Sequence, residues 1–301
     1  MDLLYASITP GQLPRFLSVS IADAVRHAPN DLTIILVASS FDLPWHSIQQ
    51  LLTFVYVQAT KVAQDMNRVL MQIDVLLQTP DSPIPAAISR PNTVFRIEGD
   101  SVSLPPDLIS IPHKLLARGG ESTSDAPLAE TTRVSRFPVV ALGGTFDHLH
   151  AGHKILLSMG AWLATEKLIV GVTDDALLVR KVHAEVLQPL PERIDIVRAF
   201  LNKFKPGLVY DLVPINDVYG PTGWDRNIQG LVVSKETASG AAAIASHRAE
   251  HNLPALETFT IDVISATETD ISAADAEYMK QAKMSSTYIR EWIVKNRRDE
   301  F

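Results

Sequence analysis

The sequence predicts an α/β protein whose carboxyl-terminal part forms a doubly wound parallel sheet, preceded by a second α/β domain. Two observations carry this prediction. After residue 137, apolar runs of strand length alternate with stretches of helical apolar spacing, and a similar mixture precedes residue 117. A polar, aperiodic segment separates the two parts. Strands that alternate with helices build parallel sheets that are covered on both faces and bind ligands at the carboxyl ends of their strands.

The domain boundary is predicted at residues 118–136, which are small, polar and without apolar period, as in a solvated linker. We therefore expect an amino-terminal domain over residues 1–117 and a second domain over residues 137–301. In the first, residues 32–38 predict a buried strand and residues 48–77 carry helical spacing. No phosphate loop or nucleophile motif is found there, so an ordering, docking or partner-binding role is expected.

The carboxyl-terminal part contains a complete series of predicted elements. Pro191 favours a helix start, because its missing N–H is not needed in the first turn. The predicted strands cover residues 137–142, 168–172, 208–215, 230–233 and 258–264, and the predicted helices cover residues 151–164, 191–204, 238–251 and 285–295.

Composition narrows the classes of function. With 46% hydrophobic and 20% charged residues, 301 residues can bury a substantial core. The net charge of −7 argues against a nucleic-acid surface, and the absence of cysteine excludes disulfides, thiolate metal sites and thiol nucleophiles. The apolar runs are shorter than the ~20 residues of a membrane span, and Asp2 stands where a secretory leader carries positive charge. We expect a soluble, cytoplasmic protein without membrane contact.

The strongest motif is VVALGGTFDHLHAGHKILL at residues 139–157. It leaves a predicted strand through Gly143 and Gly144 and enters a predicted helix, whose unpaired N–H groups and dipole attract an anion. His150 and His153 are three residues apart and share one helix face, so both imidazoles can reach one phosphate. Three other interpretations are open at this point: an ordinary turn, surface or core histidines, and a zinc site.

A second motif lies near the carboxyl terminus, where KMSSTYIREW occupies residues 283–292. Ser285, Ser286 and Thr287 stand at a predicted helix start, flanked by Lys283 and Arg290. Alone, such a run is an ordinary helix cap. In a chain that also carries the first motif, it predicts a second phosphate-binding helix start.

Together the two motifs resemble a known superfamily. GTFDHLHAGH resembles the T/HxGH signature of nucleotidyltransferases, and KMSST resembles their ISSS or ISST element. The doubled glycine, with GVTDDALLVRKVHAE, VPINDVYGPT and LVVSKETASGAAAI, is similar to the eukaryotic and archaeal phosphopantetheine adenylyltransferases over residues 137–296. The resemblance implies a Rossmann-like domain that transfers AMP from ATP to 4'-phosphopantetheine, giving dephospho-coenzyme A and pyrophosphate.

The resemblance also implies residue roles. His153, His150 and Lys181 are expected to be catalytic through charge stabilisation. The expected ATP-binding residues are Gly144, Thr145, Phe146, His150, His153, Lys283, Ser285, Ser286, Thr287 and Arg290. The expected acceptor-binding residues are Thr145, Arg180, Lys181 and Lys235.

Lys235 departs from the family pattern, because bacterial relatives carry an Arg-Gly pair where this chain has VSKET at residues 233–237. Its structural alternative is the polar start of the following helix, with Ser234 or Thr237 as the cap. His183 and Glu185 are expected on an exposed loop.

The implied reaction is an in-line displacement at the α-phosphorus, so positioning and charge neutralisation replace a protein nucleophile. We expect Mg²⁺ to arrive with ATP and expect no metal-binding residues in the protein. The expected partners are the two substrates, together with a second copy of the chain or other coenzyme A pathway enzymes bound through the amino-terminal domain. The alternatives are a cytidylyltransferase-like enzyme acting on a phosphorylated alcohol, and a non-catalytic scaffold with this fold.

Overall fold

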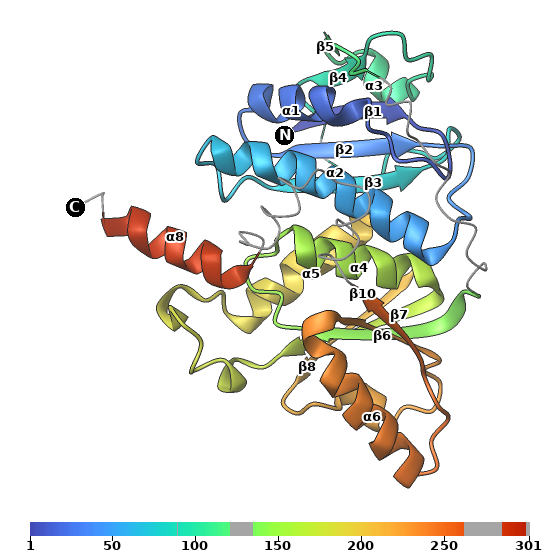
Figure 1. Ribbon diagram of the computed structural model, residues 1–301, viewed down its shortest axis with the longest axis vertical. Helices are drawn as coiled ribbons and strands as arrows, with labels where there is room; N and C mark the ends of the chain where they lie inside the picture. Colours follow the sequence, from blue (N-terminus) through green and yellow to red (C-terminus); the bar gives the residue numbers. More distant parts are fainter. Residues whose placement is uncertain (89, 121–134, 262–284, 299–301) are drawn as a thin grey trace. The chain divides into compact units, whose positions relative to one another are not determined.

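The chain forms two compact units, each built on a five-stranded parallel sheet (Figure 1). The computed structural model describes residues 1–88, 90–120, 135–261 and 285–298. Of these, residues 1–120 belong to the amino-terminal unit and the others to the carboxyl-terminal unit. The α/β class predicted for both parts is confirmed. Residues 121–134, most of the predicted linker, lie outside the described residues.

The amino-terminal unit has the strand order β3-β2-β1-β4-β5. The strand β2, which lies between β3 and β1, is buried along its whole length, as expected of a parallel strand with both faces covered. The strands are β1 (Asp2–Ser7), β2 (Leu32–Val37), β3 (Ile73–Gln78), β4 (Val94–Ile97) and β5 (His113–Leu116), and the helices are α1 (Leu17–His27), α2 (Trp45–Asp65) and α3 (Pro106–Ile109).

The helix predicted over residues 48–77 is wrong over its last 12 residues, 66–77. The helix α2 ends at Asp65, and Asn67 adopts a left-handed backbone with φ 57°, a conformation that commonly follows a helix end. The apolar residues that continued the pattern belong to β3, which begins at Ile73. Short buried runs carry no period that separates helix from strand.

The carboxyl-terminal unit has the strand order β10-β9-β6-β7-β8. Its predicted elements are confirmed within a few residues at each end, except that residues 262–264 of the last predicted strand lie outside the described residues. The strands are β6 (Phe137–Gly144), β7 (Ala164–Thr173), β8 (Val209–Ile215), β9 (Gly230–Ser234) and β10 (Glu257–Ile261), and the α-helices are α4 (Ala151–Leu163), α5 (Leu190–Phe204), α6 (Ala238–Glu250) and α8 (Ser286–Arg298).

Helices cover both faces of this second sheet. Leu142 lies against α4, and a Cβ on Gly160 would collide with its side chain, so the glycine lets helix and strand pack closely. The neighbouring residue Ala141 points to the opposite face and joins a cluster with Ile244 of α6. The strand order reverses between β6 and β9, the point at which such sheets bind ligands at their carboxyl edge.

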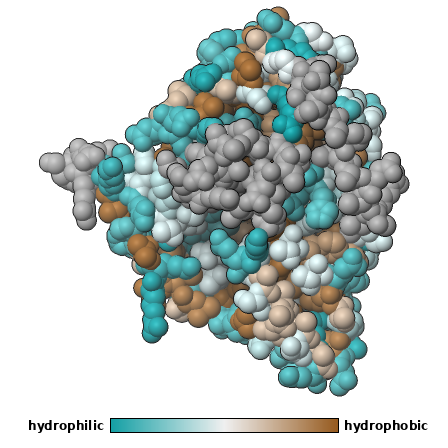
Figure 2. Space-filling view, viewed as in Figure 1, coloured by the Kyte–Doolittle hydropathy of each residue, from teal (hydrophilic) through white to brown (hydrophobic). Residues whose placement is uncertain are grey.

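Two further features are the character of the surface and the length of the helices. Apolar and hydrophilic side chains are interspersed over the face of the carboxyl-terminal unit drawn in Figure 2, which is usual for protein surfaces. None of the helices that the structure describes combines the length and the apolar character needed to cross a bilayer.

Candidate active site

The first motif forms a tight loop, here called the phosphate loop (residues 143–150), between β6 and α4. Phe146 and His148 both have positive φ, at 52° and 44°. A Cβ on Gly144 would lie 3.0 Å from a carbon of the Phe146 ring, so this glycine leaves the room that the folded-back loop requires. His150 is the residue that precedes the first turn of α4. The loop therefore delivers its backbone to a helix N-terminus.

The two predicted catalytic histidines lie against each other. The rings of His150 and His153 are stacked with centroids 3.9 Å apart, and His153 also contacts the ring of Phe146 at 5.2 Å. Both Nδ1 atoms are shielded from solvent and have no hydrogen-bond partner within the described part of the chain. The stack thus presents two unused ring nitrogens beside a helix N-terminus.

Burial also sets the charge of this pair. Desolvation lowers the pKa of His153 to about 4, although the nearby Asp147 opposes the shift. The pKa of His150 is lowered well below its ordinary value, first by desolvation and then by His153, Lys154 and His148. Both rings are therefore neutral at pH 7 in the protein without ligand.

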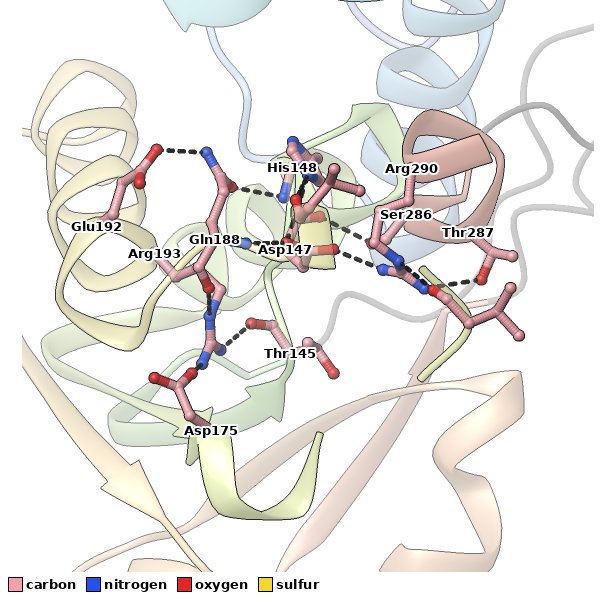
Figure 3. Close-up of polar contacts among 12 residues, drawn as sticks. Thr145, Asp147, His148, Asp175, Gln188, Glu192, Arg193, Ser286, Thr287 and Arg290 are labelled. Atoms are coloured by element: carbon pink, nitrogen blue, oxygen red, sulfur yellow. Dashed lines mark hydrogen bonds and ion pairs between the residues drawn. The ribbon is translucent and has the colours of Figure 1, made fainter. Parts of the chain in front are cut away.

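The two motifs are in direct contact, although 139 residues separate Ser286 from Asp147 (Figure 3). The Ser286 Oγ atom donates a hydrogen bond of 2.8 Å to the Asp147 carbonyl oxygen. The Tyr288 N–H donates to Ser285 Oγ at 3.2 Å, so Ser285 caps the first turn of α8. The start of α8 consequently lies beside the phosphate loop, as the sequence predicts for two parts of one site.

Arg290 faces the protein. Its Nη1 atom lies 2.6 Å from Asp147 Oδ2, its Nε donates to the Val182 carbonyl at 2.8 Å, and its Nη2 donates to Thr287 Oγ1 at 3.2 Å. The side chains of Arg290 and Asp147 are 3% and 0% exposed. The predicted contact of Arg290 with ATP therefore competes with a buried ion pair that already engages all three nitrogens.

A second buried arginine supports the loop, and the sequence analysis did not single it out. Arg193 on α5 is fully buried. Its Nη1 donates to the Thr145 carbonyl at 2.6 Å, its Nη2 to the Thr173 carbonyl at 2.9 Å and to Asp175 at 2.6 Å, and its Nε to Gln188 at 2.9 Å. One guanidinium thus joins the carboxyl ends of β6 and β7 to α5.

The predicted acceptor-binding residues Arg180 and Lys181 are exposed on the segment that follows β7, here called the basic loop (residues 175–189). Several hydrogen bonds fix this loop to the rest of the site, among them two that involve its backbone carbonyls. The Val182 carbonyl accepts from Arg290, and the Val186 carbonyl lies 2.8 Å from the His148 ring. The basic pair is therefore held near the phosphate loop while its cations remain accessible.

The remaining residues named from the sequence lie at the end of β9, on the basic loop and outside the described residues. Ser234 and Thr237 form a reciprocal cap at the end of β9, which confirms the predicted cap. Lys235 is exposed in that turn, at the carboxyl edge of β9. His183 and Glu185 lie 3.3 Å apart on the basic loop, while Lys283 lies outside the described residues.

A dedicated metal site does not emerge from the residues described. No group of three or more His, Asp or Glu side chains in residues 1–88, 90–120, 135–261 and 285–298 is arranged to hold an ion. The buried carboxylate of Asp147 already accepts hydrogen bonds from Arg290 and from the Gln188 N–H. The cations and amides of this site are suited to an anion.

Residues 141–292, which include both motifs, match the family model described as cytidylyltransferase-like. The chain belongs to the cytidylyltransferase-like family. This confirms the superfamily predicted from the two motifs, and the match spans the elements from β6 to α8.

Three similar proteins indicate which members of this family the chain resembles. A phosphopantetheine adenylyltransferase of Saccharomyces cerevisiae is 42% identical over 159 residues, which are 53% of this chain and 50% of that protein. An uncharacterized protein of Schizosaccharomyces pombe is 41% identical over 52% of this chain and 48% of its own length. A phosphopantetheine adenylyltransferase of Methanopyrus kandleri is 35% identical over 44% of this chain and 83% of its own length. The chain spans about half the length of the two fungal relatives.

Proposed function

We propose that the carboxyl-terminal unit transfers the AMP part of MgATP to 4'-phosphopantetheine, giving dephospho-coenzyme A and pyrophosphate. The observation that carries this proposal is the match to the M. kandleri phosphopantetheine adenylyltransferase, which extends over 83% of that protein and therefore over nearly a whole enzyme of that name. The direct contact between the phosphate loop and α8 supports it, because it brings two anion-binding helix starts within reach of one triphosphate.

In the proposed reaction, a phosphate oxygen of 4'-phosphopantetheine attacks the α-phosphorus of ATP in line. A new P–O bond forms to the acceptor phosphate, and the bond between the α-phosphorus and the bridging oxygen breaks, so that pyrophosphate leaves with the electron pair. The protein does not need to supply a nucleophile. Its part is to hold both reactants and to stabilise charge on the transferred group.

The proposed roles follow from the position of each residue. His150 and His153 bind triphosphate oxygens through ring N–H groups, and Gly144, Thr145 and Phe146 offer the backbone of the phosphate loop. The first turn of α8, at Ser285, Ser286 and Thr287, binds the same triphosphate from the other side. We assign Mg²⁺ to the substrate MgATP, held by the triphosphate.

The acceptor phosphate is proposed to bind the exposed cations of the basic loop, Arg180 and Lys181. Lys235 is a further proposed contact, because it lies at the carboxyl edge of β9, next to β6 at the reversal of strand order. A cytoplasmic location, an oligomeric state and a partner-binding role for the amino-terminal unit remain predictions from the sequence.

The proposal is tested by coupled detection of pyrophosphate. The full chain is incubated with ATP and 4'-phosphopantetheine, and in parallel with CTP and glycerol 3-phosphate. Release with the first pair, together with dephospho-coenzyme A detected by mass, supports the proposal. Release with the second pair alone transfers the function to a cytidylyltransferase, and silence with both supports the scaffold alternative.

A further inference from the structure

Three segments that carry the predicted substrate-binding residues meet at one buried ion pair. The phosphate loop carries His150, the basic loop carries Arg180 and Lys181, and α8 begins at the serine run. The phosphate loop and the basic loop follow the neighbouring strands β6 and β7, which pair in the sheet. Side-chain hydrogen bonds join α8 to both loops (Figure 3). Asp147 and Arg290 supply most of those contacts.

Asp147 is the central acceptor of this arrangement. Its Oδ2 accepts from Arg290 Nη1 at 2.6 Å, and its Oδ1 accepts from the Gln188 N–H of the basic loop at 3.0 Å. Its carbonyl oxygen accepts from Ser286 at 2.8 Å. One buried residue of the phosphate loop is therefore hydrogen-bonded to both other segments.

Arg290 makes the complementary connections from α8. It reaches the phosphate loop through Asp147 and the basic loop through the Val182 carbonyl, and its third nitrogen is occupied by Thr287. These acceptors lie in different directions around a planar, five-donor fork, a pattern that a lysine ammonium on a flexible chain does not reproduce. The hydrogen bonds of Arg290 therefore hold α8 against both the phosphate loop and the basic loop.

The pairing also has an electrostatic consequence. A lone carboxylate beside a triphosphate site would repel its ligand, and a lone guanidinium there would bind it. At 2.6 Å, with side chains 0% and 3% exposed, the two charges neutralise each other out of contact with solvent. The cations left to bind phosphates are then those of the accessible segments.

We propose that Asp147 and Arg290 are a positioning pair that sets the ATP-binding segments and the acceptor-binding basic loop in register, and that Arg290 is not itself a phosphate ligand. This inference rests on the proposed function for its kinetic readout. It departs from the expectation that the resemblance gives for Arg290, and it links the affinities of the two substrates to one side-chain contact.

The Asp147→Asn variant distinguishes the two roles by the sign of its effect. If Arg290 positions the segments, loss of the carboxylate loosens them, so the dissociation constant for ATP and the KM for 4'-phosphopantetheine both rise, and kcat/KM falls by roughly 10- to 100-fold. If Arg290 is a phosphate ligand held back by Asp147, the same change frees its guanidinium, and ATP binds more tightly.

The Arg290→Lys variant gives the second arm. It keeps the positive charge but not the forked guanidinium. If Arg290 is a positioning residue, the substrate constants should therefore stay impaired. If Arg290 is a phosphate ligand, the lysine should restore ATP binding in large part. The matched control is Arg248→Lys. Arg248 is also buried and bonds the carbonyls of Thr222, Asp225 and Pro254, but it lies near the end of α6, at the opposite edge of the sheet. The control should lose stability without a change in either substrate constant.

A double variant, Asp147→Asn with Arg290→Gln, covers the case in which a single variant does not fold, because it leaves no unpaired buried charge. It should show the same joint loss, and no more than the larger single loss, since both changes remove one contact. Additive losses, an effect on the ATP constants alone, or constants that match those of Arg248→Lys at a temperature where all variants are folded would overturn the inference.

A separate measurement, on the unaltered protein, tests the proposed function itself. If the unaltered protein releases no pyrophosphate with ATP and 4'-phosphopantetheine, the function is refuted. Calorimetric binding of ATP to the same variants then still decides the role of Arg290, with weaker binding to Asp147→Asn supporting the positioning pair and unchanged or tighter binding refuting it.

Discussion

Acidification should destabilise the carboxyl-terminal unit through the stacked pair His150 and His153. The folded-state pKa of His153 is about 4, below the ordinary 6.5, because its ring is desolvated. Between these values the unfolded chain binds a proton that the folded chain does not. The stability that the neutral ring contributes is therefore complete above the ordinary pKa and is lost as the pH falls through this window.

The magnitude follows from the same difference. The gap between 6.5 and about 4 corresponds to about 3 kcal/mol once the pH is below both values, and to about 2 kcal/mol near pH 5. The pKa of His150 is lowered in the same direction by the same cause. The pair should thus lose more than His153 alone.

Urea unfolding at about pH 7 and about pH 5 measures this loss. A Trp45→Phe background removes the tryptophan of the amino-terminal unit and leaves three in the carboxyl-terminal unit, of which Trp162 on α4 is a buried reporter. The reference variant carries His150→Gln and His153→Gln, which cannot titrate in this range. The parent should lose more than about 2 kcal/mol relative to the reference between the two pH values, because His153 alone accounts for about that much. Parallel losses would show that the histidines are not held neutral by burial.

Three further predictions concern single substitutions. His153→Ala should lower the rate of pyrophosphate release by about 10²- to 10³-fold at saturating substrates, the usual effect of losing one preorganised donor, and an unchanged rate would remove this ring from the mechanism. Arg193→Lys should lower the unfolding free energy by about 2–4 kcal/mol, because a lysine cannot satisfy the Thr145, Thr173 and Gln188 carbonyls together; a loss below about 0.5 kcal/mol in urea unfolding would contradict this. Gly160→Ala should cost about 1–3 kcal/mol through overpacking against Leu142, whereas a gain in melting temperature would mean that helix propensity decides there.

The sequence predicted the carboxyl-terminal unit well because its elements are long and strongly patterned. The helix spacing that placed His150 and His153 on one face agrees with their stacked rings. The contact between the phosphate loop and α8 was predicted from two anion-binding helix starts, and the Ser286 hydrogen bond confirms that they meet. The amino-terminal unit was less accessible, since β4 and β5 are four residues each and β3 continued a helical pattern.

The ion pair could not be predicted, because nothing in the sequence near Arg290 indicates a carboxylate 143 residues away. A motif shows that a cation is present but not which way it points. The sequence contains a weaker signal for the buried position of Arg193. It stands on the apolar face of α5 together with Val197, Phe200 and Phe204, where an arginine is unexpected unless its donors are satisfied inside the fold. An inward arginine on an amphipathic helix is a usable signal for a buried anchor.

The proposed function requires that the phosphate loop and the start of α8 bind one triphosphate. A crystal structure of the full chain with a non-hydrolysable ATP analogue tests it most directly. Phosphate oxygens are expected within hydrogen-bond distance of the His150 and His153 rings and of the first-turn amides of α8, with Arg290 still paired to Asp147. A nucleotide bound elsewhere, or one that contacts only one of the two segments, would contradict it.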